Sequence, residues 1–171
     1  MISDIDKDVK SAKVSSFADD TRALNAISSQ ADVANLQSDL ETLYEWSEFN
    51  NAMFNPEKFE CMRYGLNKDI IDNSFYLSNT GTVIQCKSSV KDLGVTFTSD
   101  AKFNEHISNT VISAGLKCGW ILRTFKTRES FPLLVLWKAL VMPILDYCSQ
   151  LWSPIAVGQI KALEMWQLNY L

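Results

Sequence analysis

The sequence predicts an α+β protein in which the two kinds of structure follow one another along the chain. Up to residue 100, short runs of β-branched and aromatic residues alternate with turn residues, and one helical pattern interrupts them. After residue 100, apolar residues recur at steps of three and four, which is the helical period. The chain has 171 residues, 47% of them hydrophobic, which suits one ordinary domain or two small units. We expect a mixed part over residues 1–100 and an all-helical part over residues 101–171.

The first predicted element is a β-hairpin over residues 14–27. Two short runs that are compatible with strands flank Asp19 and Asp20, and aspartate is a common turn residue. The hairpin would carry both carboxylates at its tip.

A helix is expected next, over residues 29–50. Its apolar positions recur at steps of four, three and three and form one stripe: Leu36, Leu40, Leu43 and Trp46. We expect acidic residues to occupy its other faces: Asp32, Asp39, Glu41, Glu45 and Glu48.

Strands are predicted after this helix. The first covers residues 59–64, the next two cover residues 75–77 and 83–86 on either side of a turn, and the last covers residues 90–97.

Three helices are predicted after Asp100. The first has an apolar stripe at steps of four and three: Phe103, Ile107, Val111, Ala114, Cys118, Ile121 and Phe125. The second covers residues 130–149, and Pro143 should kink or split it. The third begins near Ile160 and continues to Leu171.

Composition excludes several classes of protein. The chain has 16 Lys and Arg against 20 Asp and Glu, a net charge of −4, so it is not a uniformly cationic nucleic-acid-binding protein. The four cysteines are 25, 32 and 30 residues apart, without the short spacing of a zinc site. We therefore expect free thiols and an intracellular location, in the nucleus or cytoplasm. The longest late uncharged run, residues 147–160, is too short to span a bilayer, and no membrane partner is expected.

The sharpest chemical feature is the pair Asp19 and Asp20 at the tip of the predicted hairpin. Two adjacent carboxylates repel each other unless a cation lies between them. Oxygen ligands on a rigid turn suit Mg²⁺, which takes one or two carboxylates together with substrate phosphates. Taken by itself, an Asp-Asp pair is usually a solvated turn, so both interpretations stay open. His106 is the only histidine, and we expect it to be a half-buried helix residue without a catalytic role.

Several motifs follow one another in an order that resembles one family of polymerases. They are Phe17-Ala18-Asp19-Asp20, Leu36 to Leu40 with Trp46-Ser47, Phe54 to Lys58, Lys91 to Val95, Met142 to Cys148, and Leu151 to Pro154. The series is similar to the reverse transcriptases of non-LTR (LINE-type, jockey-like) retrotransposons. The resemblance implies that residues 1–100 are the C-terminal part of a polymerase palm, with motifs C, D and E. Residues 101–171 would then be a helical thumb that is truncated at its C-terminus.

The resemblance also implies roles for individual residues. Asp19 and Asp20 match the catalytic aspartates of motif C, which bind Mg²⁺, with two ions in the intact enzyme. Lys58 matches the motif D lysine that is thought to protonate the pyrophosphate leaving group, and a solvated turn lysine is the alternative. Leu93 and Gly94 match the primer grip of motif E, and the alternative for Gly94 is a strand glycine at a bulge.

A basic cluster lies at the end of the first predicted thumb helix and consists of Lys117, Arg123, Lys126 and Arg128. The resemblance favours contact with phosphates of the template–primer duplex, which would be independent of base sequence and sensitive to salt. The alternative is that these cations complement the C-terminus of the helix.

The activity that the resemblance implies is RNA-directed DNA synthesis, with an RNA template, a DNA primer and a dNTP as partners. The family takes a third aspartate from motif A and selects the nucleotide with motif B and the fingers, all upstream of the stretch that matches this chain. We therefore expect a fragment that lacks this upstream segment and does not extend a primer by itself. The alternative is a non-catalytic retroelement relic that acts as a nucleic-acid-binding or protein-interaction module.

Overall fold

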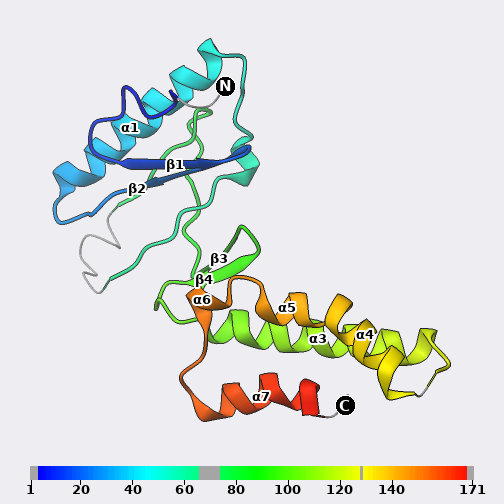
Figure 1. Cartoon of the computed structure of the whole chain (residues 1–171). Coiled ribbons are helices and arrows are strands. Elements are labelled where there is room, and N and C mark those ends of the chain that lie inside the picture. The colour runs from blue at the N-terminus through cyan, green and yellow to red at the C-terminus, as the bar shows by residue number, and fades with distance from the viewer. Residues whose placement is uncertain (1–3, 66–73, 128, 169–171) are drawn as a thin grey trace. The chain divides into compact units, whose positions relative to one another are not determined.

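The computed structural model describes residues 4–65, 74–127 and 129–168 (Figure 1). The chain divides into two compact units, Met1–Ser88 and Ser89–Leu171. Among the described residues, the first unit holds a two-stranded sheet and one long helix, and the second holds another two-stranded sheet followed by helices. The expected α+β class is therefore confirmed. The division between the units lies before the strands near residue 90, which the sequence analysis grouped with the first part of the chain.

The predicted hairpin is present, with strand β1 at Lys13–Phe17 and strand β2 at Asp20–Leu24. The strands pair antiparallel, and Phe17 lies opposite Asp20 at the end of the ladder. No third strand joins this sheet among the described residues. A two-stranded sheet is only marginally stable in water without further packing, so the hairpin depends on what holds its base.

Helix α1 spans Gln30–Phe49, close to the predicted range. It begins with a capping box, in which the Ser29 side chain accepts from the Asp32 N–H and the Asp32 carboxylate accepts from the Ser29 N–H at 2.8 Å. Asn50 caps its C-terminal end, as expected. The start of the helix is thus specified by residues that are neighbours in the sequence.

The packed side of α1 carries the core of the first unit. Of the predicted apolar stripe, Leu43 is buried and the other three residues are half-buried. Tyr44 is also buried, and its ring meets those of Phe54 and Phe59 edge-to-face, with centroids 6.3 and 5.4 Å away. Asp39 is buried on the same side, so the expectation that acidic residues occupy only the other faces is wrong at this position.

The segment after α1 contains less regular strand than the sequence predicts. A 3-10 helix, η1, covers Pro56–Lys58. The predicted strand at residues 59–64 is reduced to Cys61, which forms an isolated parallel bridge with Cys86. The strand prediction is wrong here because the backbone of this segment meets a single partner residue and builds no ladder.

Between residues 75–77 and 83–86, where the sequence predicts two strands, the structure contains one isolated β-bridge. Leu77 and Val83 make a single antiparallel bridge. The turn between them is present, and Gly81 adopts a φ of 74°, in the left-handed region that glycine occupies without strain.

The segment at residues 90–97, predicted as one strand, is a second hairpin. Strand β3 covers Ser89–Asp92 and strand β4 covers Val95–Thr98, in an antiparallel pair. The two turn residues, Leu93 and Gly94, have φ values of 44° and 83°. Positive φ at both central residues is the arrangement that two-residue hairpins favour. Leucine rarely adopts it, so the run of strand-forming residues does not reveal the reversal.

The rest of the second unit is helical. The helices are α3 (Asn104–Thr124), α4 (Ser130–Leu140), α5 (Met142–Asp146), α6 (Ser149–Trp152) and α7 (Val157–Leu168). The predicted split at Pro143 is confirmed, because this proline lies in the first turn of α5, where it has no helical N–H to lose. Within the described ranges, none of the helices has the length and apolar character needed to cross a lipid bilayer.

Two apolar clusters hold the second unit together. In the first cluster, α3 contributes Ala114, Cys118 and Ile121. They pack against Leu133 and Trp137 of α4 and against Val141, which follows α4. The second cluster joins β4, α3 and α6 through Val95, Ile107 and Trp152. The predicted stripe of α3 is confirmed, since four of its seven residues are buried and the others are half-buried.

Candidate functional site

The tip of the β1–β2 hairpin presents the two aspartates that the sequence singled out. Ala18 and Asp19 form the turn, and Asp20 is the first residue of β2. Ala18 adopts a φ of 54°, where a non-glycine residue is strained. Both aspartates are exposed, and in the described part of the chain no hydrogen bond or ion pair holds either carboxylate. The turn therefore offers two adjacent carboxylates to solvent.

The donors at this tip fit part of a Mg²⁺ site. Carboxylate oxygens are the ligands that Mg²⁺ prefers, and an exposed tip leaves room for water and substrate phosphates. No group of three His, Cys, Asp or Glu side chains that could hold a metal occurs among the described residues. Asp19 and Asp20 would therefore share a metal with oxygen ligands from water, from a phosphate or from another segment.

Lys58 is the last residue of η1 and belongs to the same unit as the hairpin. The backbone is fixed on both sides of it, because the Asn55 side chain accepts from the Glu57 N–H at 3.0 Å and the Phe59 ring packs against Tyr44. Its side chain is exposed. The structure describes no contact between Lys58 and the two aspartates, so their catalytic grouping stays a prediction.

The turn at Leu93 and Gly94, the predicted primer grip, is held by Tyr147. The Tyr147 hydroxyl donates to the Leu93 carbonyl at 2.9 Å. The tyrosine ring also approaches Gly94 so closely that a Cβ there would lie 3.1 Å from Cε1. Two separate reasons favour glycine at this position: its φ of 83° is in the left-handed region, and the Tyr147 ring leaves little space for a side chain. Gly94 therefore lies in a tight turn of paired strands and not at a bulge.

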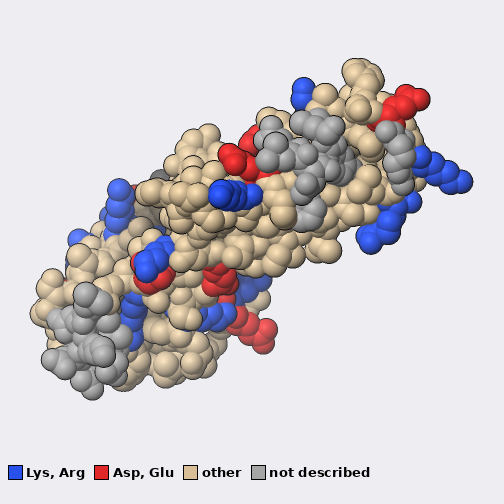
Figure 2. Space-filling view, turned by 90° about the horizontal axis from the view of Figure 1, so that it is seen from below, with Lys and Arg blue, Asp and Glu red and all other residues tan. Residues whose placement is uncertain are grey.

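The four residues of the predicted basic cluster differ in their surroundings. The Lys117 ammonium lies 5.3 Å from the centroid of the Trp120 ring, within its own helix. Arg123, in the last turn of α3, and Lys126, just beyond it, are exposed, and Arg128 lies outside the described residues. Figure 2 shows Lys and Arg side chains projecting at the end of the second unit where α3 leads into α4. Arg123 and Lys126 are thus placed to meet a polyanion, although Arg123 also suits the helix C-terminus.

His106 is more deeply buried than expected and has a structural role. Its Nδ1 accepts from the Thr96 N–H at 3.3 Å, and its ring meets Trp152 edge-to-face at 5.1 Å. Burial lowers the pKa of His106, and the positive charge of Lys91 acts in the same direction. With Nδ1 as the acceptor, the His106 ring joins β4 to α3.

Asp39 was expected on an exposed face of the helix, but it is buried. It is 4% exposed, and its carboxylate accepts three backbone hydrogen bonds, from Lys10 (3.0 Å), Ser11 (2.9 Å) and Ala12 (2.7 Å). The Ser11 hydroxyl donates to it as well. Burial by itself would raise the pKa of Asp39, but these hydrogen bonds together lower it.

This carboxylate ties the segment before β1 to α1 and so anchors the base of the hairpin that carries Asp19 and Asp20. The sequence did contain a sign of it. Asp39 lies three residues after Leu36 and four before Leu43, which are the spacings of one helix face.

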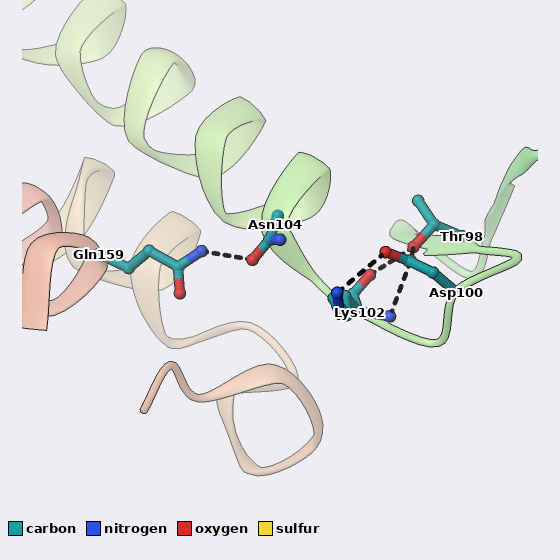
Figure 3. A network of polar contacts seen from close by, with 5 residues as sticks. All are labelled: Thr98, Asp100, Lys102, Asn104 and Gln159. Atoms are coloured by element: carbon teal, nitrogen blue, oxygen red, sulfur yellow. Dashed lines mark hydrogen bonds and ion pairs between the residues drawn. The ribbon is translucent and has the colours of Figure 1, made fainter. Parts of the chain in front are cut away.

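A polar network closes the turn between β4 and α3 (Figure 3). Asp100 accepts from the Thr98 hydroxyl and, at 3.1 Å, from the Lys102 N–H. The Thr98 hydrogen bond contributes most to a lowered pKa of Asp100, followed by that of Lys102. Gln159 of α7 donates to the Asn104 side chain at 2.7 Å and so joins α7 to the first turn of α3. These contacts hold the turn before α3 and join α7 to α3, so each has a structural role.

Comparisons with known proteins leave the family open. No family model matches the chain, and no solved structure matches it. Over 78 residues the chain is 32% identical to an uncharacterized protein of Caenorhabditis elegans. This match covers 46% of the chain and 39% of that protein. The fold and the site define a mixed α+β protein with two exposed carboxylates on a hairpin tip.

Proposed function

We propose that this chain is the late palm and thumb of an RNA-directed DNA polymerase of the non-LTR retrotransposon type. The observation that carries the proposal is the hairpin whose tip holds Phe17-Ala18-Asp19-Asp20 with both carboxylates exposed. Such a tip presents hard oxygen ligands where a nucleotide–metal complex can approach. The order of the elements supports it: the hairpin is followed by α1, Lys58, a second hairpin and a helical unit, as the resemblance to that family requires.

In this proposal each group has one task. Mg²⁺, when bound, supplies charge stabilisation for the attacking and leaving oxygens of nucleotidyl transfer. Asp19 and Asp20 contribute two of the carboxylates that hold it. Lys58 donates a proton to the pyrophosphate as the leaving oxygen gains charge. The turn at Gly94 supports the primer end.

The first sheet is also compatible with a place inside a larger palm sheet. Among the described residues, β1 and β2 pair only with each other. Phe17 and Leu24 are 64% and 57% exposed. Exposed apolar side chains on a short sheet with open edges are typical of strands that pair further. We propose that an upstream palm segment pairs here and brings the third carboxylate.

The coding sequence tests this proposal directly. We expect the reading frame upstream of the Met1 codon to encode a strand with the motif A aspartate, followed by motif B. A start codon directly at Met1, with a stop codon in frame before it, would instead favour the non-catalytic relic.

Cation binding at the hairpin tip can be measured with Mn²⁺ as a paramagnetic substitute for Mg²⁺. We expect Mn²⁺ to broaden the NMR resonances of residues 17–21, because two carboxylates at one turn hold a divalent cation better than scattered ones do. The Asp19→Asn/Asp20→Asn variant should lose this broadening while keeping the fold. The Asp6→Asn/Asp8→Asn variant removes the same charge from another exposed segment and should leave it unchanged. Broadening that survives in the first variant would rule out the tip as the site.

Binding to an RNA–DNA hybrid tests the basic end of α3. Replacing Arg123 and Lys126 by Gln should weaken binding for all base sequences alike. It should also reduce the slope of log K against log salt by about one for each phosphate that the variant no longer neutralises. Fluorescence anisotropy at several salt concentrations measures both quantities. The matched control is Lys138→Gln/Lys161→Gln, which removes two exposed cations from α4 and α7. Equal slopes for the two variants would assign Arg123 and Lys126 to the helix terminus alone.

One observation favours a second candidate, an interaction module without catalysis. Ile112, Leu116 and Trp120 follow one another at four-residue steps along α3 and are 59%, 68% and 44% exposed. A row of apolar side chains outside the packed core is typical of a surface that docks another protein. If the parent chain does not bind nucleic acid and its reading frame starts at Met1, this candidate would be favoured over the polymerase fragment.

A further inference from the structure

Cys61 and Cys86 lie opposite each other in the structure, although 25 residues separate them in the sequence. The Cys61 N–H donates to the Gln85 carbonyl at 3.2 Å, and the Lys87 N–H donates to the Cys61 carbonyl at 2.8 Å. These two bonds flank Cys86 and make the two cysteines the paired residues of a parallel bridge.

This pairing has the geometry that a disulfide requires. Chain segments paired by backbone hydrogen bonds lie about 4.7–4.9 Å apart. A disulfide spans Cα separations of about 4.4–6.8 Å. Paired residues also project their side chains to the same side of the ladder, so both thiols lie on one side of the Cys61–Cys86 bridge. The backbone pairing therefore places the two cysteines within the range that a disulfide can span.

We propose that Cys61 and Cys86 form an oxidisable dithiol, a site where a peroxide converts two thiols into a disulfide that links the segment after η1 to the segment before β3. This inference is independent of the polymerase proposal, because it rests only on the pairing of these two residues.

The two thiols have different environments and therefore different roles. Cys86 is exposed, whereas Cys61 is half-buried. Burial first, and then the hydrogen bond and charge of Cys86, raise the pKa of Cys61 to about 12. The solvent-facing sulfur of Cys86 is thus the one that meets the peroxide. The charge of Arg63 acts in the opposite direction, but the pKa of Cys61 stays raised, so Cys61 reacts second, as a thiol that gives up its proton in that step.

The chemistry balances with hydrogen peroxide as the oxidant. The Cys86 thiolate attacks one peroxide oxygen, the O–O bond breaks, and the departing hydroxide takes a proton and leaves as water. Cys86 is then a sulfenic acid. The Cys61 sulfur attacks the Cys86 sulfur, the S–O bond breaks, and hydroxide leaves with the Cys61 proton as a second water. Two thiols are oxidised to one disulfide, and one peroxide is reduced to two waters.

Mass spectrometry of the full chain tests the proposal. The reduced protein is treated with one equivalent of hydrogen peroxide, alkylated and digested. We expect a linked peptide that joins Cys61 to Cys86, that dithiothreitol removes, and that exceeds every other cysteine pairing at least about tenfold. Cys118, which is buried in the first apolar cluster of the second unit, should be recovered as the alkylated thiol. The melting temperature of the oxidised chain should rise, since the bond closes a long loop.

Variants separate the two steps. Cys61→Ser should stop the reaction at a Cys86 sulfenic acid that dimedone labels, and Cys86→Ser should leave Cys61 unmodified. Cys118→Ser is the matched control and should give the same yield of linked peptide as the parent chain. The proposal fails if the parent chain accumulates Cys86 sulfinic acid or intermolecular disulfides in place of the linked peptide. It fails equally if Cys61 or Cys86 pairs with Cys118 or Cys148 at comparable yield.

Discussion

Replacing Asp39 by alanine is expected to lower the free energy of unfolding of the first unit by about 3 kcal/mol, the scale of losing a buried charged acceptor and leaving its donors unpaired. Three backbone N–H groups and the Ser11 hydroxyl converge on this carboxylate. Alanine offers none of them an acceptor, so the segment at residues 10–12 must detach from α1 to reach water. The base of the hairpin that carries Asp19 and Asp20 would detach with it.

Urea denaturation followed by the indole N–H NMR signal of Trp46 measures this loss in the first unit, because the other tryptophans lie in the second unit. Hydrogen exchange should show faster exchange at the amides of residues 10–12 and in β1. The matched control is Glu45→Ala, which removes an exposed acidic side chain from the same helix and should change the stability by less than about 0.5 kcal/mol. If the two variants are equally stable, Asp39 does not anchor the hairpin.

The pKa of Asp39 sets the pH dependence of this contribution. Its folded-state pKa is lowered, whereas the unfolded value is roughly 3.9. The stabilisation is therefore fully present above the unfolded value and is lost as the pH falls through the folded one. We expect the stability difference between the parent chain and Asp39→Asn to be constant near neutral pH and to shrink in strong acid. A difference that grew on acidification would contradict the sign of the shift.

The second large effect is expected at Gly94, where alanine should destabilise the second unit by about 2 kcal/mol. Alanine in the left-handed region costs roughly 1–2 kcal/mol, and Gly94 has a φ of 83°. The added Cβ would also lie 3.1 Å from the Tyr147 ring. If the ring moves, the hydrogen bond from the Tyr147 hydroxyl to the Leu93 carbonyl is weakened. Such a bond contributes about 0.5–1.5 kcal/mol to stability.

Gly119 provides the matched control, since it lies within α3 and a Cβ there would meet no atom within 4 Å. Gly119→Ala should be neutral or stabilising, because alanine favours a helix over glycine. Tyr147→Phe keeps the ring and should show only the hydrogen-bond loss. In the double variant Gly94→Ala/Tyr147→Ala the steric part of the cost should disappear and the backbone part remain, which a double-mutant cycle measures. Equal stability of Gly94→Ala and Gly119→Ala would contradict the close approach.

This second prediction also bears on the proposed function. The turn that Tyr147 holds is the one proposed to support the primer end, so Tyr147→Phe should loosen it without touching the aspartates. Faster exchange of the Gly94 and Val95 amides in this variant, with residues 17–21 unchanged, would separate the positioning of the turn from the chemistry at the hairpin tip.

The sequence by itself determined the features that neighbouring residues specify. The hairpin with Asp19 and Asp20 at its tip, the range of α1, the stripe of α3 and the break at Pro143 were all predicted and are all present. Each depends on residues within a few positions of one another, through turn preferences, a capping box, helical periodicity or a missing N–H. The pair Asp19 and Asp20 could be singled out for the same reason, because adjacent residues form it, whereas Lys58 was singled out only through the resemblance.

Only the tertiary structure decided the features that depend on distant partners. Asp39 is buried because donors 27 to 29 residues away converge on it, and periodicity alone does not reveal them. The reversal at Leu93 and Gly94 is held by Tyr147, 54 residues from Leu93. The pairing of Cys61 with Cys86 is likewise invisible in their spacing. A buried polar group is stable only where its hydrogen-bonding partners are assembled around it. That assembly is a property of the folded chain, and the local sequence does not contain it.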